Sequence, residues 1–271
     1  MRYLTALLSR SIAKIRSRRS SRMFHRKITF ARRLRCELLE HRNLMAVIAW
    51  DGGAATMNWN DRYNWVGDAI PGAADDVTIN VTGSDATILL SGANASVRSL
   101  NNQEGLAIDA GATLTLSGET ASTVHGIFVN SGTVHVQNGS LTLDGGSTSS
   151  GTFTIDAGAY MYFQGSGVED GNSKNYILSG VIQGEGIVYF RHASATLTGL
   201  YDITGTTTID FLVSSDSLNF NNVQNVGSEL SVVRSRSGAA VNFYLNNGTT
   251  LAPLNVTKLA LSGASLNKWA D

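Results

Sequence analysis

The sequence LAIDAGATLTLSG, residues 106–118, decides the fold, because two short alternating segments flank the turn Asp-Ala-Gly-Ala. The pattern returns at residues 153–165 as FTIDAGAYMYFQG, with an offset of 47 residues between Ile108 and Ile155. Aliphatic residues that alternate with Thr are typical of strands that bury one face. Because Gly and Asp between them favour turns, each copy predicts two strands joined by a turn.

More segments of this kind lie between the two copies, GTVHV at residues 132–136 and GSLTLDG at residues 139–145. Gly111, Gly132 and Gly151 are 21 and 19 residues apart. Self-similarity near 20 residues, with no helical period, is typical of coils that stack and cover one another's apolar side chains. We therefore predict an all-β fold, a single-stranded parallel β-helix with inward aliphatic rows and outward Thr rows.

The pattern continues to the end of the chain in less regular form. GEGIVYF at residues 184–190 and LYDITGTTTID at residues 200–210 have the same alternation. We assign residues 83–271 to the β-helix repeats and expect them to be truncated at the C-terminal end. The alternative is that Trp269 plugs the last coil.

Charge divides the 271 residues into a basic head and an acidic body. Residues 1–45 contain 13 Lys or Arg and 2 Asp or Glu, whereas residues 46–271 contain 8 and 19. A segment this basic is typical of an amphipathic helix or a disordered tail that is separate from the packed core. The composition alone leaves three possibilities for it: an export leader, an organelle transit peptide or a tail that binds nucleic acid nonspecifically.

The end of the head resembles a known export signal. The run RCELLEHRNLMA at residues 35–46 is similar to the "LE-x-R-x-L-L-A" box that closes the basic leader of large exported proteins of planctomycete bacteria. His41 stands where that family commonly has Pro or Gln. The segment from Gly199 to Ile209 also resembles a recurrent coil of these proteins. The resemblance implies that residues 1–46 form a leader, that it is cleaved near Ala46, and that the mature protein is secreted or held at the cell surface.

Residues 47–82 are rich in Trp and Gly and predict an N-terminal cap. Three of the four tryptophans, Trp50, Trp59 and Trp65, fall within sixteen positions and stand beside Gly, Asn or Asp. The first coil of a solenoid has an exposed apolar end that must be covered. A Trp side chain covers it effectively, because each one buries about 150–250 Å² of surface. The segment also resembles the region that precedes the β-helical part of autotransporter-like surface proteins. A second interpretation is that Trp59 and Trp65 stack on the sugar rings of a glycan.

Metal ligands are sparse in the sequence. Asp68, Asp75 and Asp76 are weak candidates for a Ca²⁺ site, because such a site needs six to eight oxygen donors and no EF-hand spacing is present. Asp109 and Asp156 are expected at equivalent corners, where aligned acids could bind a cation. We expect no cofactor, with Ca²⁺ as the weak alternative.

Aromatic and basic residues mark two further candidate glycan contacts. Tyr160, Tyr162 and Phe163 form an aromatic ladder on one predicted strand, and Arg191-His192 follows the aromatic pair Tyr189-Phe190 on another. Aromatic faces and basic side chains both contact sugars, but packing or an exposed strand face is the interpretation that the sequence favours for these residues.

No residue is predicted to be catalytic. Enzymes on this architecture need convergent carboxylates beside Lys or Arg. The acidic residues of the body are isolated, and turn chemistry accounts for most of them: Asp109, Asp144, Asp156, Asp202 and Asp210. His125 and His135 lack a third metal donor. The sequence contains no P-loop, GxGxxG, nucleophile elbow or HExxH motif, and Cys36, its one cysteine, lies in the head.

These observations predict a secreted, non-enzymatic β-helix that serves as a surface or extracellular-matrix protein of adhesin-like type. The alternative is a carbohydrate-binding or carbohydrate-acting β-helix whose catalytic coils are lost or lie outside this chain. Expected partners are extracellular polysaccharide or other surface proteins, and no nucleic acid. Self-association through the solenoid ends is a further expectation. No apolar run reaches about 18 residues, so no membrane-spanning helix is predicted.

Overall fold

The computed structural model describes residues 46–81, 86–165, 174–211, 217–220, 223–234, 240–243 and 258–262. Contacts divide the chain into a unit of residues 1–42 and a unit of residues 43–271, and every described residue belongs to the second. The predicted leader before Ala46, Cys36 within it and Trp269 lie outside the described residues. The described part consists of β-strands and the turns and loops between them, with one short 3-10 helix, η1 (Arg62–Asn64).

The strands of the described residues form three parallel sheets. Sheet 1 contains, in spatial order, β1 (Val47–Ala49), β2 (Asp76–Ile79), β5 (Ser99–Asn102), β8 (Ala121–Val124), β11 (Ser140–Leu143), β14 (Tyr160–Gln164), β17 (Ile187–Arg191), β20 (Thr206–Phe211), β23 (Glu229–Arg234) and β25 (Lys258–Ser262). Sheet 2 contains β3 (Thr87–Leu90), β6 (Gly105–Ile108), β9 (Phe128–Asn130), β12 (Ser147–Ser149), β15 (Lys174–Leu178), β18 (Ala193–Leu197), β21 (Ser217–Phe220) and β24 (Ala240–Phe243). Sheet 3 contains β4 (Ala95–Val97), β7 (Thr113–Leu116), β10 (Thr133–Val136), β13 (Thr152–Ile155), β16 (Val181–Gly184), β19 (Tyr201–Ile203) and β22 (Val223–Val226).

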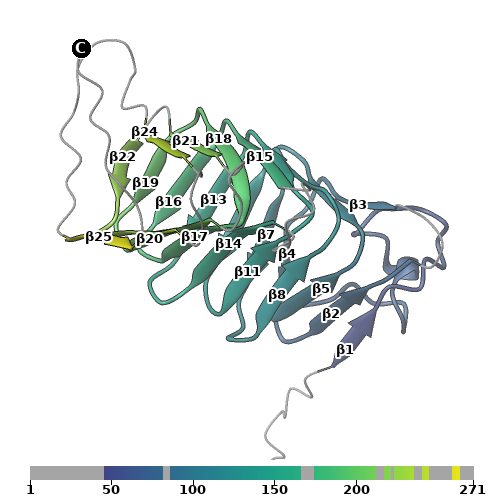
Figure 1. The fold of residues 1–271 in the computed structure, drawn as a ribbon. Helices are drawn as coiled ribbons and strands as arrows, with labels where there is room; N and C mark the ends of the chain where they lie inside the picture. Colours follow the sequence, from purple (N-terminus) through teal and green to yellow (C-terminus); the bar gives the residue numbers. More distant parts are fainter. Residues whose placement is uncertain are drawn as a thin grey trace, which may run out of the picture. The chain divides into compact units, whose positions relative to one another are not determined.

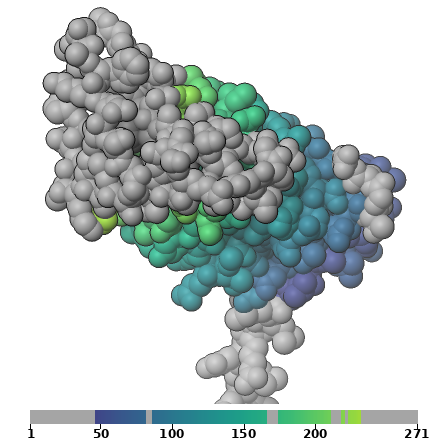
Figure 2. Space-filling view, viewed as in Figure 1, coloured from purple at the N-terminus to yellow at the C-terminus, as the bar shows by residue number. Residues whose placement is uncertain are grey.

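The chain visits the sheets in the order 1, 2, 3 and then returns to sheet 1 one level further on. From β2 onward most strands therefore pair in parallel with the strand three places later, as β7 does with β10 and β10 with β13. Figure 1 shows the successive strands of each sheet side by side along one axis. In Figure 2 the colours of the described residues follow one another along this axis, so each coil occupies its own slice. The predicted parallel β-helix is confirmed, with about seven turns.

Alternation along each strand builds the core. In β10, Val134 and Val136 are fully buried, whereas Thr133 and His135 point outward and stay partly exposed. Because the sheets are in register, the inward side chains form continuous rows, and Leu114, Val134 and Phe153 are neighbours in one of them. Each coil therefore covers the apolar side chains of the next, which is the predicted source of stability.

In four successive coils the corner between sheets 2 and 3 requires glycine. Gly132, Gly151, Gly180 and Gly199 occupy this corner in successive coils. A Cβ atom at Gly199 would lie 1.7 Å from the carbonyl oxygen of Gly180, and one at Gly180 would lie 1.9 Å from that of Gly151. The backbones of stacked coils are thus too close for any side chain here.

The two Asp-Ala-Gly-Ala turns are alike locally but occupy different corners. In each, the N–H of the final Ala donates to the carbonyl of the Asp at 3.0 Å, and the Gly has a positive φ near 80°, +83° at Gly111 and +82° at Gly158. However, the turn at Asp109 joins sheet 2 to sheet 3, whereas the turn at Asp156 joins sheet 3 to sheet 1. The predicted equivalence of these two corners is wrong, because a turn motif fixes local backbone shape and not the sheet that follows.

The Trp-rich opening caps the N-terminal end of the solenoid, as predicted. β1 pairs with β2 on sheet 1, and Asn58 forms a bridge to Leu89 on sheet 2. Trp59 and Trp65 are completely buried, and Trp50 is 7% exposed. Because β2 already pairs with β5, the first coil begins inside the segment 47–82 that was assigned to the cap.

Candidate binding surface

The outward face of sheet 1 brings together aromatic and polar residues that are far apart in sequence. β14 and β17 are neighbours, and their register pairs Tyr162 with Tyr189 and Gln164 with Arg191. The two separate glycan contacts predicted at residues 160–162 and 191–192 therefore form one surface. We call this surface the tyrosine patch and define it as Tyr160, Tyr162, Gln164, Tyr189, Arg191, His192 and Asp210.

The three tyrosine rings are nearly parallel. The centroids of Tyr162 and Tyr189 are 4.7 Å apart, and the ring planes differ by 11°. Neighbouring strands are about 4.8 Å apart, so these two rings stack along the direction that runs from strand to strand. The ring of Tyr160, two residues back on the same strand, lies 6.3 Å from that of Tyr162 and 13° from parallel. This separation matches the rise of two residues, so Tyr160 and Tyr162 lie side by side along β14, and the ring of Tyr160 is 6.5 Å from that of Tyr189.

One face of this ring pair is covered and the other is turned toward small side chains. Tyr189 lies against the face of Tyr162 that points to β17. On the opposite side, the residues of β11 in register with Tyr160 and Tyr162 are Ser140 and Thr142. Because Ser and Thr side chains are much shorter than a phenol, the rings of Tyr160 and Tyr162 project further from the sheet than the side chains of β11. We call these two rings the ring wall, and the hydroxyls of β11 lie beside it.

The inner face of the same two strands has a matching aromatic stack. Phe163 and Phe190 follow Tyr162 and Tyr189 in sequence, and their rings are 5.0 Å apart and 10° from parallel. Both are fully buried. Alternation therefore assigns the tyrosines to the surface and the phenylalanines to the core, and Phe163 takes no part in the outer face.

Polar groups lie at one edge of the tyrosine patch. Arg191 Nε is 4.0 Å and His192 Nε2 is 3.8 Å from Asp210 Oδ2, and Asp210 is in register with Arg191 on β20. The Arg191 side chain is 49% exposed, whereas that of His192 is only 16% exposed. Arg191 is thus the accessible base of the pair, and His192 packs against the carboxylate.

Packing of the tyrosine rings alters their acidity. Partial burial raises the pKa of Tyr162, and the neighbouring hydroxyls of Tyr189 and Tyr160 raise it further, against a smaller opposing effect of Arg191. The phenol therefore stays neutral over the whole physiological range and remains able to donate a hydrogen bond.

The calcium candidates are not assembled into a site. Arg98 and the Ser99 hydroxyl both contact the carboxylate of Asp76, and Asp75 Oδ2 accepts the Gly72 N–H at 2.8 Å. Burial acts to raise the pKa of Asp76, but the Ser99 and Arg98 contacts outweigh it, so this pKa lies below its ordinary value. Asp68 lies in an exposed turn with φ of +53°. Within the described residues, no three His, Cys, Asp or Glu side chains come together as metal ligands.

The tryptophans predicted as glycan contacts are unavailable to a ligand. Trp59 and Trp65 are both 0% exposed, and Trp65 Nε1 donates to the Trp59 carbonyl at 2.7 Å. Their rings are 4.9 Å apart in an edge-on arrangement, and Trp50 packs edge-on against Trp65 at the same distance. The structure therefore supports capping and leaves no ring face for a sugar.

Several of the acidic residues predicted to be isolated instead join one coil to the next. His125 Nδ1 lies 2.8 Å from Asp144 Oδ2, and His135 Nε2 lies 2.9 Å from Asp156 Oδ1. In each pair the histidine belongs to one coil and the aspartate to the next. Two other acids predicted in turns, Asp202 and Asp210, lie within strands β19 and β20 instead.

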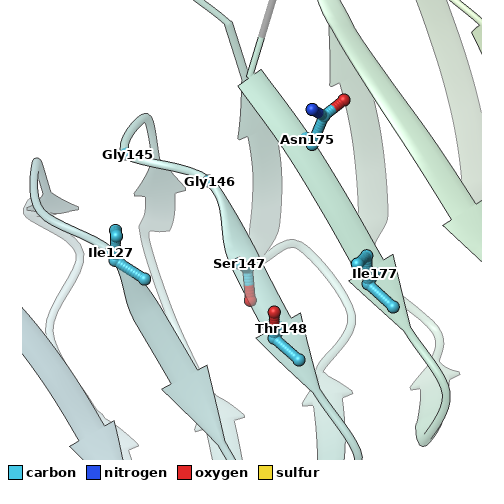
Figure 3. A pocket seen from close by; sticks show the side chains of 7 residues that line it. All are labelled: Ile127, Gly145, Gly146, Ser147, Thr148, Asn175 and Ile177. Carbon is cyan, nitrogen blue, oxygen red and sulfur yellow. The ribbon is translucent and has the colours of Figure 1, made fainter.

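A shallow hollow lies on the outside of sheet 2. Its lining is Ile127, Gly145, Gly146, Ser147, Thr148, Asn175 and Ile177. Figure 3 shows these residues on the adjacent segments that contain β9, β12 and β15. Ile127 and Ile177 are 66% and 53% exposed, and the lining contains no titratable side chain. The hollow offers apolar contact but no group for chemistry.

Three members of the tyrosine patch, Tyr189, Gln164 and Asp210, were not predicted as contacts. A signal was present in the dipeptide Tyr-Phe, which occurs at 162–163 and again at 189–190. The interval of 27 residues exceeds the 19 or 20 residues of the regular coils, because more residues separate the end of β14 at Gln164 from the start of β15 at Lys174. A search limited to a period near 20 misses the pairing.

Comparison of the chain with protein-family models, curated proteins and solved structures finds no match. Within the described residues, no helix has the length and hydrophobicity needed to cross a membrane.

Proposed function

We propose that this protein is a non-enzymatic, adhesin-like β-solenoid that acts as a structural component outside the cell or on its surface. The observation that carries the proposal is the use of side chains to fasten coil to coil. Asp76, Asp144, Asp156 and Asp210 each lie beside an Arg or His of an adjacent coil. Carboxylates that pair with a neighbouring coil in this way stabilise the stack of coils. They do not converge on one point, as the carboxylates of a catalytic site would.

The surface of the solenoid also supports a display function. The sheets place partly exposed polar residues in rows at the spacing of the strands, for example Thr123 and Thr142 on the neighbouring strands β8 and β11 of sheet 1. Such a surface offers many similar contacts along one axis, and many weak contacts combine into strong attachment.

We further propose that residues 1–46 export the body. The basic head and the box at residues 35–46 support this, and cleavage near Ala46 would release a mature protein that begins immediately before β1 (Val47–Ala49). Attachment to the outside of the cell needs such a route, since the protein has to leave the cytoplasm before it can act there.

The test is to locate the protein in fractionated cells that encode it and to compare their attachment with that of a deletion strain. We expect the protein in the medium or on the surface with a mature N-terminus near residue 47, and weaker attachment on its loss. Purified protein should release no reducing or unsaturated sugar ends from extracellular polysaccharide. An intracellular location would contradict the proposal, and release of sugar ends would favour a carbohydrate-acting enzyme instead.

A further inference from the structure

We propose that the tyrosine patch is a binding site for a neutral polysaccharide, with one pyranose ring lying against the wall formed by Tyr160 and Tyr162. This inference rests on the proposed adhesive function and names the ligand class for it. It depends on three observations: the free ring face, the paired polar groups beside it and the charge of the body.

The ring wall has the shape that a sugar needs. A pyranose presents an apolar C–H face and a rim of hydroxyls, so it binds where a flat aromatic surface stands beside hydrogen-bonding groups. Tyr160 and Tyr162 lie side by side with their free face toward Ser140 and Thr142. The wall thus supplies the flat surface, and the strand at its foot supplies hydroxyls.

The polar edge supplies both donors and acceptors. Arg191 donates, Asp210 accepts and the amide of Gln164 does both. Arg191 and Asp210 are close enough to offset each other's charge, at 4.0 Å. Hydroxyl groups, which are neutral and act as donor and acceptor at once, match this edge better than a charged ligand does.

The charge of the body selects against acidic polymers. Residues 46–271 contain 8 Lys or Arg and 19 Asp or Glu, a net charge of −11. A negative surface repels a polyanion and lowers its rate of association. With one exposed arginine that already faces a carboxylate, the tyrosine patch lacks the cationic groups that a uronate polymer needs.

The fold does not require tyrosine at these positions. In the same outward row of sheet 1, the neighbouring coils have Thr142 on one side and Thr208 on the other. Ser140 likewise stands in register with Tyr160. Because Ser and Thr occupy this outward row of sheet 1 in the neighbouring coils, the fold tolerates small side chains there. The cluster of three tyrosines is therefore a local feature of the outward face that stacking of the coils does not demand.

The test is affinity electrophoresis of the protein through gels that contain a soluble neutral glucan, mannan or xylan, with polygalacturonate as the acidic comparison. The variant Tyr162→Thr/Tyr189→Thr carries the residue of the adjacent coils and is expected to keep the fold. Tyr63→Thr is the matched control, because Tyr63 is exposed and also lies beside an arginine, Arg62, and no other tyrosine of the described residues stacks on it. Tyr160→Ser, which copies Ser140, is a second variant in case the double variant fails to fold.

We expect the wild type and Tyr63→Thr to be retarded by at least one neutral polymer, and the patch variants to bind it on the order of tenfold more weakly. Retardation by polygalacturonate alone, by no neutral polymer, or equally in wild type and patch variants would overturn the proposal. These outcomes leave the surface location and the lack of sugar-end release untouched, so failure here is distinct from failure of the proposed function.

Discussion

Two clusters of three aromatic residues stand at different places on the solenoid and do different work. At the N-terminal end, Trp50, Trp59 and Trp65 pack edge-on, at 4.9 Å for each of the two neighbouring pairs, and are buried. On the outward face of sheet 1, Tyr160, Tyr162 and Tyr189 lie nearly parallel and stay partly exposed. The edge-on arrangement closes an end, whereas the parallel arrangement follows the spacing of the strands and leaves one face open.

The difference teaches that position in the coil, rather than residue type, decides what an aromatic side chain does. Tyr162 and Phe163 are adjacent in sequence, yet one faces solvent and the other the core. Tyr201 is a tyrosine that faces the core, fully buried with its hydroxyl 2.7 Å from Thr207 Oγ1. The predictions below test this contrast between inside and outside.

The largest effect is expected at the cap. Trp65→Ala should lower the free energy of unfolding by about 4–5 kcal/mol, because it removes a buried ring and leaves a cavity against the first coil. Urea unfolding followed by circular dichroism measures this. The exposed Tyr63→Ala, in the same segment, should cost less than about 0.5 kcal/mol. Equal costs for the two variants would show that the tryptophans are not the cap.

Adjacent residues of β14 should behave in opposite ways. Phe163→Ala should cost about 3–4 kcal/mol of unfolding free energy, since its ring packs between Phe190 and Phe153 in the core. Tyr162→Thr should cost about 0.5–1.5 kcal/mol, the worth of its ring stacking. If Tyr162→Thr were the more costly of the two in urea unfolding, the assignment of inner and outer faces would be reversed.

High pH should unfold the body through its buried tyrosines. Burial raises the pKa of both Tyr176 and Tyr201 well above the ordinary value, so the folded state keeps the proton that the unfolded state loses. The contribution of these two tyrosines to the free energy of unfolding is therefore fully present below about pH 10, the ordinary pKa of tyrosine, and is lost as the pH rises above that value. Tyrosinate absorbance and circular dichroism should change together. Tyr162→Thr should remove one ionisation and leave the coupling between tyrosinate absorbance and unfolding in place, because Tyr176 and Tyr201 stay buried.

The smallest effect is expected at the contact that joins the first two coils. The pKa of Asp76 is lowered in the folded state, so its contribution is present above about pH 4 and is lost as the pH falls below that value. Asp76→Asn should cost about 0.5–1 kcal/mol at pH near 7, given that both side chains are about a quarter exposed. The difference from wild type should shrink as the pH falls below about 4 and vanish once the carboxyl is protonated in the folded state as well. A difference that persists in acid urea titrations would contradict an ionic contact.

The parts of the structure that follow from local pattern could be predicted, and those that depend on register could not. Alternation in β10 and β14 identifies the inward residues, and the clustered tryptophans identify the cap. The turns at Asp109 and Asp156 look identical in sequence, yet they lead into different sheets, because a strand period of two residues carries no information on which sheet comes next. The joining of the two predicted contacts into one tyrosine patch was missed for the same reason, since the long coil between Tyr162 and Tyr189 breaks the period.

The most direct test of the central claim, that successive coils stack along one axis, is pulsed electron paramagnetic resonance on spin labels at positions 123 and 208, with Cys36 replaced by Ser. These positions are four strands apart in sheet 1, so their backbones should be about 19 Å apart. Moving the first label from Thr123 to Asn101, one coil earlier, should lengthen the distance by about 4.8 Å. A distance that stays the same or shortens would contradict the stack.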